Sequence, residues 1–320
     1  MKRRSVLLSS LALAGLHPAR AQPLDKPRRI AFLMAGSTPR PGQFSTVDAV
    51  SSGLRERGYS ALQPHAWYAD GRIEALPALA QQALAWQPEV LVTNLTPAAR
   101  AAQQATRSVP IVMAGSGDPV ATGLVQSLAR PGGNVTGVAA LGPELAAKSV
   151  ELLHELRPGL QRLGVLANAA DSFTPPLLQA LTQAATLLQL QLAVEHVREP
   201  SQYAAAFARW RSEQVEAVFV QPSLPGRAAA ELALRHGLPS GSFVRGFVEQ
   251  GGLLAYANDL AEIARLAVDY VDRILRGATP AALPVQQNTR FDLMFNLRTS
   301  RALGLQLPGT LLQRATEVIE

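Results

Sequence analysis

Small and polar residues follow three apolar runs in the first half of the chain, and their types suit the binding of a small molecule. The runs end at Met34, Thr93 and Ala114, and each following loop combines small residues with a hydroxyl, an amide or a carboxylate. Small residues let a ligand approach the backbone closely, and the polar side chains can orient it by hydrogen bonds. The candidate ligand-binding residues in these loops are Ser37, Thr38, Asn94, Thr96, Ser116 and Asp118.

The second half of the chain offers a weaker set of the same kind, in loops 168–172, 221–223 and 240–242. Other roles remain open for several candidates in both halves. Thr96 before Pro97 also fits a helix N-cap, Asp118 before Pro119 also fits a turn, and an aromatic residue near a strand end is often part of a core. The candidates in this half are Asn168, Gln221, Ser223, Ser242 and Tyr256.

Sequence signatures of common enzymes are missing. No Gly-x-x-x-x-Gly-Lys-Ser/Thr phosphate loop and no Gly-x-Ser-x-Gly elbow occur, and no Gly-x-Gly-x-x-Gly turn follows Met34. Because the chain has no cysteine, disulfides and thiolate chemistry are excluded. His65, His154, His196 and His236 are far apart in sequence and form no pair at helical spacing, so no zinc motif is present. We therefore expect a protein that is not an enzyme and that needs no cofactor or metal.

The elements that must position these loops are short strands alternating with helices. This alternation is typical of parallel sheets covered by helices on both faces, and ligands bind such sheets beyond the carboxyl ends of the strands. The predicted strands cover residues 30–34, 90–93, 111–114, 163–166, 192–197, 217–220 and 253–256. The predicted helices cover residues 47–57, 76–86, 145–156, 175–188, 203–211, 227–236 and 260–276.

Two changes in the pattern predict where the chain passes between domains. One lies at the Gly/Pro-rich stretch that ends in residues 134–142, and the other at residues 248–252. We expect an α/β fold of two doubly wound parallel-sheet lobes joined by a hinge that the chain crosses several times. The first lobe is predicted to contain residues 28–138 plus about 252–280, and the second lobe residues 139–251 plus about 281–320.

Residues 1–21 are predicted to form a secretory signal peptide. Lys2, Arg3 and Arg4 precede a short apolar run, and Ala19-Arg20-Ala21 offers small residues for cleavage. Removing this segment lowers the formal charge from +6 to +2 and leaves no basic run, so nucleic acid is not an expected partner. With no later membrane span and no cysteine for a lipid anchor, we expect an unanchored monomer in the periplasm.

Several motifs spread along the chain resemble those of the tryptophan/tyrosine-type substrate-binding proteins of ABC transporters, which have the periplasmic-binding-protein type I architecture. The resemblance extends from Arg28 to Glu320. The motifs that carry it are Gly117-Asp118-Pro119-Val120, the run from Leu128 to Gly137, Gly251-Gly252-Leu253-Leu254, Tyr270-Val271-Asp272-Arg273, and Leu283-Pro284-Val285.

The resemblance implies a receptor that captures a small molecule between its lobes and delivers it to an ABC permease with a cytoplasmic ATPase. An amino acid or another carboxylate is the expected ligand class. The chain has Ala255-Tyr256-Ala257 where relatives tend to show Ser-Tyr-Gly, so a relative's ligand is not transferred to it. Two alternatives stay open: a ligand-sensing periplasmic protein that serves a membrane receptor, and an enzyme on the same scaffold.

Overall fold

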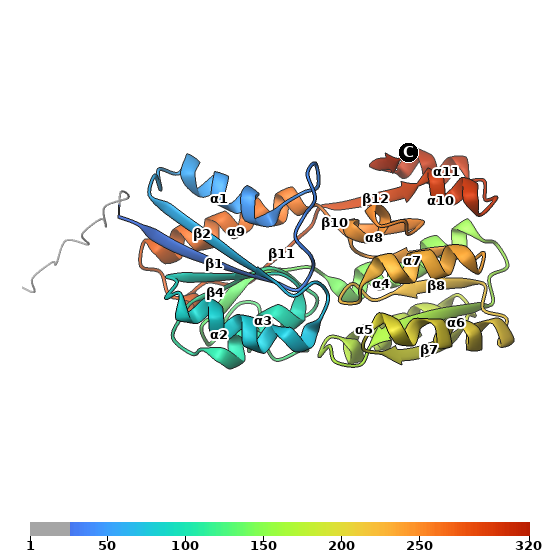
Figure 1. Cartoon of the computed structure of the whole chain (residues 1–320), viewed down its shortest axis with the longest axis horizontal. Helices are drawn as coiled ribbons and strands as arrows, with labels where there is room; N and C mark the ends of the chain where they lie inside the picture. The colour runs from blue at the N-terminus through green and yellow to red at the C-terminus, as the bar shows by residue number, and fades with distance from the viewer. Residues whose placement is uncertain (1–25) are drawn as a thin grey trace, which may run out of the picture.

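The computed structural model describes residues 26–320, which form two lobes side by side (Figure 1). The expected signal peptide lies outside the described residues. Each lobe contains one sheet of mainly parallel strands with helices on both faces. This arrangement confirms the predicted fold class of two doubly wound α/β lobes.

The first sheet is parallel throughout, in the order β11-β5-β4-β3-β1-β2. Helices α1 and α9 cover one face and α2 and α3 cover the other, so the central strands are buried on both sides and consist of continuous apolar runs. The bounds are β1 Arg28–Met34, α1 Thr46–Glu56, β2 Leu62–Tyr68, α2 Leu76–Ala85, β3 Val90–Thr93, α3 Leu95–Ala105, β4 Ile111–Ser116, β5 Val135–Ala139, α9 Leu260–Leu275 and β11 Gln286–Gln287.

The second sheet has the order β13-β12-β10-β9-β8-β6-β7, and only the pair β10 and β12 is antiparallel. Helices α4 and α5 pack on one face, and α6 and α7 pack on the other. The bounds are α4 Gly142–Leu156, β6 Arg162–Asn168, α5 Thr174–Leu187, β7 Gln191–Val197, α6 Tyr203–Ser212, β8 Ala217–Val220, α7 Gly226–Arg235, β9 Ser240–Ser242, α8 Arg245–Glu249, β10 Leu254–Asn258, β12 Phe291–Asn296, α10 Leu297–Ala302, α11 Gly309–Arg314 and β13 Glu317–Ile319.

The chain crosses between the lobes three times, after β5, after β10 and after β11. Two buried asparagines tie the crossings together. Asn258 donates a hydrogen bond from Nδ2 to the Ala140 carbonyl at 3.0 Å, and Asn288 donates from Nδ2 to the Asn258 side-chain oxygen at 2.8 Å. The Asp259 amide also bonds to the Arg290 carbonyl at 3.0 Å. Because three connected segments join the lobes, we expect the lobes to move relative to each other by bending at this hinge. Two lobes joined by a single linker could instead rotate freely.

The positions of two short strands differ from the prediction. The segment near residue 252 was expected in the first lobe, but β10 pairs with β9 and β12 in the second sheet, and the chain returns to the first lobe only at α9. Conversely, β11 was expected in the second lobe but pairs with β5 in the first sheet. Apolar strand patterns do not reveal which of two sheets a strand joins. We propose that the lobe boundaries follow these three crossings.

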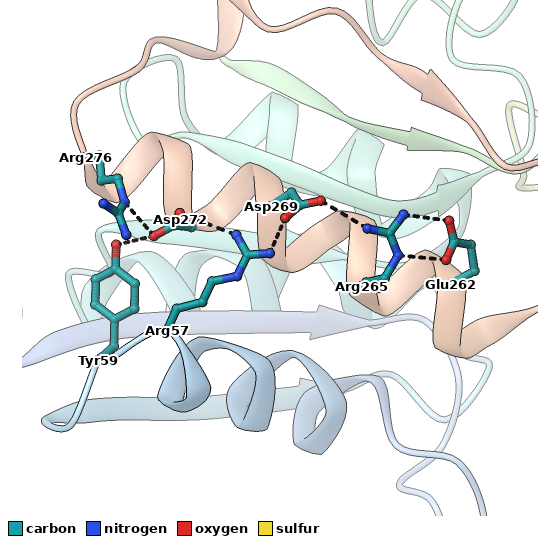
Figure 2. A network of polar contacts seen from close by, with 7 residues as sticks. All are labelled: Arg57, Tyr59, Glu262, Arg265, Asp269, Asp272 and Arg276. Carbon is teal, nitrogen blue, oxygen red and sulfur yellow. Dashed lines mark hydrogen bonds and ion pairs between the residues drawn. The ribbon is translucent and has the colours of Figure 1, made fainter.

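A network of ion pairs joins α1 to α9 on the first lobe (Figure 2). Arg57, just after α1, contacts both Asp269 and Asp272 of α9. Tyr59 is buried and donates a hydrogen bond to Asp272 at 2.7 Å. This network holds α9, which has just crossed from the second lobe, against the N-terminal part of the first. Its members are Arg57, Tyr59, Glu262, Arg265, Asp269, Asp272 and Arg276.

Candidate ligand-binding cleft

A cavity of about 500 Å³ lies between the two lobes. Residues of both sheets line it, at the carboxyl ends of β1, β3 and β4 in the first lobe and of β8 and β9 in the second. Its volume falls within the range of about 300–1,000 Å³ that small-molecule sites usually occupy. Seven of the residues predicted from the sequence line this cavity: Ser37, Thr38, Asn94, Thr96, Gln221, Ser223 and Ser242.

The first-lobe wall is built around the N-terminus of α3. Asn94 precedes this helix but does not cap it, because its side-chain oxygen accepts a hydrogen bond from the Ala35 amide at 2.8 Å. Thr96 accepts a bond from the Gly117 amide at 3.2 Å. Both side chains therefore hold neighbouring loops in place. The first turn of α3 is left without a side-chain cap at the cavity, where its N–H groups favour an anionic group.

The second-lobe wall contains a hydrogen-bonded cluster centred on Gln221. Its side-chain oxygen accepts from the Asn168 amide at 2.8 Å and from the Thr174 hydroxyl at 3.0 Å. Its side-chain nitrogen donates to Asp171 at 3.0 Å. Ser242 donates from its hydroxyl to the Val220 carbonyl at 2.7 Å. Gln221 and Ser242 thus shape the wall more than they offer free hydrogen-bonding groups to a ligand.

Asp171 lines the same wall and was not among the residues predicted from the sequence. Its side chain is 6% exposed and accepts hydrogen bonds from the Phe173 amide at 2.8 Å and from Gln221. Burial raises the pKa of Asp171 above its usual range, although the hydrogen bonds from Phe173 and Gln221 and the neighbouring hydroxyl of Ser223 act in the opposite direction. The signal that could have found it is its place in loop 168–172, directly after β6.

Four predicted residues do not line the cavity. Asp118 accepts hydrogen bonds from the amides of Val120 and Ala121 at 3.1 and 2.9 Å, which is the geometry of a turn residue. Asn168 accepts from the amide two residues on, at 3.0 Å, and so shapes its own loop. Ser116 is buried at the end of β4, and Tyr256 packs against Phe291 with ring centroids 5.6 Å apart.

The two lobes touch across the cavity. Gln43 of the first lobe donates from Nε2 to Glu249 of the second lobe at 3.0 Å. Gly71 approaches Pro225 so closely that a methyl group at its Cβ position would lie 2.9 Å from the proline ring. At the hinge side, the Phe173 ring would lie only 2.6 Å from a Cβ atom on Gly117. These contacts describe a closed arrangement of the lobes.

Some charged side chains at the cavity already form ion pairs with other protein side chains, and others do not. Arg245 is fully engaged, since it pairs with Glu249 at 2.7 Å and with both oxygens of Glu317 at 2.6 and 2.7 Å. Arg40 and Arg227 also line the cavity, and neither forms an ion pair within residues 26–320. The two unpaired guanidinium groups, one from each lobe, can neutralise an acidic ligand.

The described part of the chain contains no cluster of three or more His, Asp or Glu side chains that could hold a metal ion. Within residues 26–320, no helix combines the length and the apolar character that crossing a membrane requires.

Comparisons with known proteins agree with this geometry. The sequence model of a family described as ABC transporter substrate binding protein matches residues 37–319. A tyrosine-binding protein of Clostridioides difficile is 25% identical over 236 residues, which cover 72% of this chain and 67% of that protein. A conserved domain protein from Vibrio cholerae has a solved structure with a TM-score of 0.81 and 27% identity, covering 92% of this chain and 100% of that one. The ABC domain in complex with L-Trp from Streptococcus pneumoniae reaches a TM-score of 0.80 at 24% identity, with the same coverage.

Proposed function

The chain belongs to the family of ABC transporter substrate-binding proteins, and from this premise we propose that it is an exported receptor for a small carboxylate-bearing solute. Its fold is the two-lobed periplasmic-binding-protein type I-like fold. In this proposal the solute is enclosed between the lobes and delivered to an ABC permease with a cytoplasmic ATPase. The predicted signal peptide supports export to the periplasm.

The observation that carries the proposal is the cavity of about 500 Å³ enclosed by residues of both lobes. A ligand there contacts both lobes at once, so its binding free energy includes interactions available only when the lobes are closed. Binding then favours the closed state, as in other proteins that close two lobes around a ligand. A permease can distinguish a loaded receptor from an empty one by this difference in shape.

Two helix N-termini support a carboxylate as part of the ligand. Helix α3 in the first lobe and α7 in the second both begin at the cavity, and neither has a side-chain cap. The exposed Arg227 lies in the first turn of α7 and also lines the cavity. Amide groups at helix N-termini and an arginine both favour anions. The names of the two relatives, one that binds tyrosine and one solved with L-Trp, point to the same chemical class.

A thermal-shift panel tests this function. The panel contains the twenty amino acids, simple carboxylates without an amino group, nucleosides and neutral sugars, each at saturating concentration. We expect stabilisation by a compound that carries a carboxylate, because a ligand that binds only the folded protein raises its free energy of unfolding by about 2.7 kcal/mol at one hundred times its Kd. Stabilisation confined to neutral sugars would contradict the carboxylate. Stabilisation by no member of the panel would contradict the receptor function.

A further inference from the structure

Two leucines have a left-handed backbone, and both lie where the lobes meet. Leu141, in the first crossing, has φ 52° and ψ 44°, and Leu95, which lines the cavity, has φ 55°. This conformation is costly for a residue with a Cβ atom, and leucine lacks the short polar side chain that lets Asn and Asp adopt it. Within residues 26–320 the other non-glycine residues with positive φ lie just past helix ends or in a turn, where this conformation is common: Gln87, Gln189, Gln214 and Asp70.

Leu141 is the single residue between a segment fixed to the first lobe and a helix of the second. Before it, the Ala140 amide donates to the Ser116 carbonyl of β4 at 2.7 Å, and the Ala140 carbonyl accepts from Asn258 at 3.0 Å. After it, Gly142 is the first residue of α4. The two backbone dihedrals of Leu141 therefore set the direction in which the chain leaves the first lobe at this crossing.

The conformation of Leu141 is imposed by contacts between the lobes. The Gly142 amide donates to the Gly117 carbonyl of the first lobe at 2.9 Å. The two glycines pack so closely that a Cβ atom on Gly142 would lie 2.9 Å from the Gly117 Cα atom and 2.5 Å from the Phe173 ring. These contacts hold Gly142 against the first lobe in the closed arrangement, and so they hold Leu141 left-handed. A strained backbone persists only where the surrounding structure fixes it in this way.

We propose that Leu141 is a strained pivot, which stores strain when the lobes close and releases it when they open; this deepens the proposed receptor function and rests on it. Opening separates Gly142 from Gly117, and Leu141 then returns to an unstrained conformation. The interactions of the bound solute must offset the strain of closure. The strain therefore lowers the affinity for the solute and speeds its release, which a receptor needs in order to pass the solute on to a transporter.

The distance between the lobes can be measured with fluorophores at two chosen sites, because the chain has no cysteine of its own. Gln82 on α2 and Gln183 on α5 are exposed, lie outside the cavity and belong to different lobes. In protein that carries Gln82→Cys and Gln183→Cys and has been dialysed free of small molecules, single-molecule energy transfer counts closed and open molecules.

Leu141→Gly is the variant that tests the pivot. It removes the penalty of the left-handed backbone, because glycine has no Cβ atom. We expect it to raise the ratio of closed to open molecules about five- to thirtyfold, the factor that corresponds to about 1–2 kcal/mol.

Two control variants separate backbone strain at the pivot from other effects. Leu141→Ala removes most of the same side chain but keeps the Cβ atom, so it retains the penalty and should leave the ratio of closed to open molecules unchanged. Gln189→Gly relieves a left-handed residue with φ 57° just past α5, outside the three crossings. It should also leave the ratio unchanged.

An unchanged ratio in Leu141→Gly would overturn the pivot, because the backbone of Leu141 would then cost the same in both arrangements. An equal rise in Leu141→Gly and Leu141→Ala would overturn it as well, since the side chain and not the backbone would then set the equilibrium. These measurements use no ligand, so they are independent of the thermal-shift panel. A panel in which no compound binds would contradict the receptor function and would leave the measured ratios to decide on the pivot.

Discussion

The side chains of Gln43 and Glu249 join the two lobes, with Nε2 of Gln43 donating to the Glu249 carboxylate at 3.0 Å. Glu249 does not stand alone. It is held by Arg245, which is held in turn by Glu317 of the C-terminal strand β13. The second-lobe half of this contact is therefore fixed by an ion-pair network before the lobes meet. Such preorganisation lowers the entropic cost of forming the contact when the cleft closes.

The contact between Gln43 and Glu249 should slow the release of the ligand. The hydrogen bond exists in the closed arrangement, and opening the cleft must break it. Gln43→Ala should raise the ligand dissociation rate by about two- to tenfold, the effect of losing one hydrogen bond of about 0.5–1.5 kcal/mol. Stopped-flow displacement measures this rate. The exposed Gln82 on α2, outside the cavity, provides the control as Gln82→Ala. Equal dissociation rates for the wild type and Gln43→Ala would show that the contact has no part in closure.

Gly117 should be required for full closure. A methyl group there would lie 2.6 Å from the Phe173 ring, which projects from the start of α5 in the second lobe. Gly117→Ala should therefore penalise the closed state by about 1–3 kcal/mol, the usual cost of overpacking. Small-angle scattering should show the radius of gyration falling on ligand saturation for the wild type and falling less for the variant.

Gly133 is a matched control for this substitution, since a Cβ atom there meets nothing within 4 Å. Gly133→Ala should close like the wild type. An unchanged radius of gyration in the wild type with a ligand demonstrably bound would exclude hinge closure as the working motion.

Asp272 should make the stability of the first lobe depend on pH (Figure 2). Burial alone would raise its pKa, but hydrogen bonds from Tyr59 and Arg276 and the charges of Arg276 and Arg57 lower the pKa of Asp272 below its ordinary value. Burial, and to a smaller extent the hydrogen bond to Asp272, raises the pKa of Tyr59 to about 12. A carboxylate with a lowered pKa in the folded state stabilises the protein above the unfolded-state pKa of 3.8. That contribution is lost as the pH falls below 3.8 and through the folded-state pKa.

Asp272→Asn should therefore lower the free energy of unfolding by about 1.5–3 kcal/mol near neutral pH, and by less as the pH falls below about 4. Denaturant titrations at several pH values measure the difference. Ligand affinity should not change, since Asp272 lies outside the cleft. The comparison variant is Glu262→Gln, which breaks an exposed pair with Arg265 on the same helix and should cost less than about 1 kcal/mol. An equal loss for the two variants at all pH values would contradict this role of Asp272.

The fold was predictable from the sequence where apolar strands are buried on both faces. Strands β3, β4 and β8 are short continuous apolar runs, and their positions were predicted almost to the residue. Strand β2 was missed because it lies at the sheet edge, where polar residues such as Gln63 and His65 interrupt the apolar pattern. Strand β9 consists of Ser240-Gly241-Ser242 and owes its conformation to the neighbouring strands β8 and β10. The pattern of residue types within a short segment does not show that neighbouring strands will support it.

The candidate site was predictable at the level of loops but not of single side chains. The rule that ligands bind beyond the carboxyl ends of strands selected the loop after β6, yet within it Asn168 shapes the turn and Asp171 lines the cavity. Asp118 follows β4 in the same way, but its carboxylate turns back to bond the amides of its own loop. The direction of a loop side chain depends on competing local hydrogen bonds, which residue type alone does not decide.

The central claim is that the cleft holds a small carboxylate-bearing solute, and native mass spectrometry of the exported protein tests it most directly. Protein purified from the periplasm without denaturation, and then incubated with a concentrated extract of small metabolites, should show a mass increase equal to one small molecule. The added mass should disappear on denaturation, and fragmentation of the released compound should identify a carboxylate. Protein that retains no compound, or that retains only uncharged compounds such as sugars, would contradict the account.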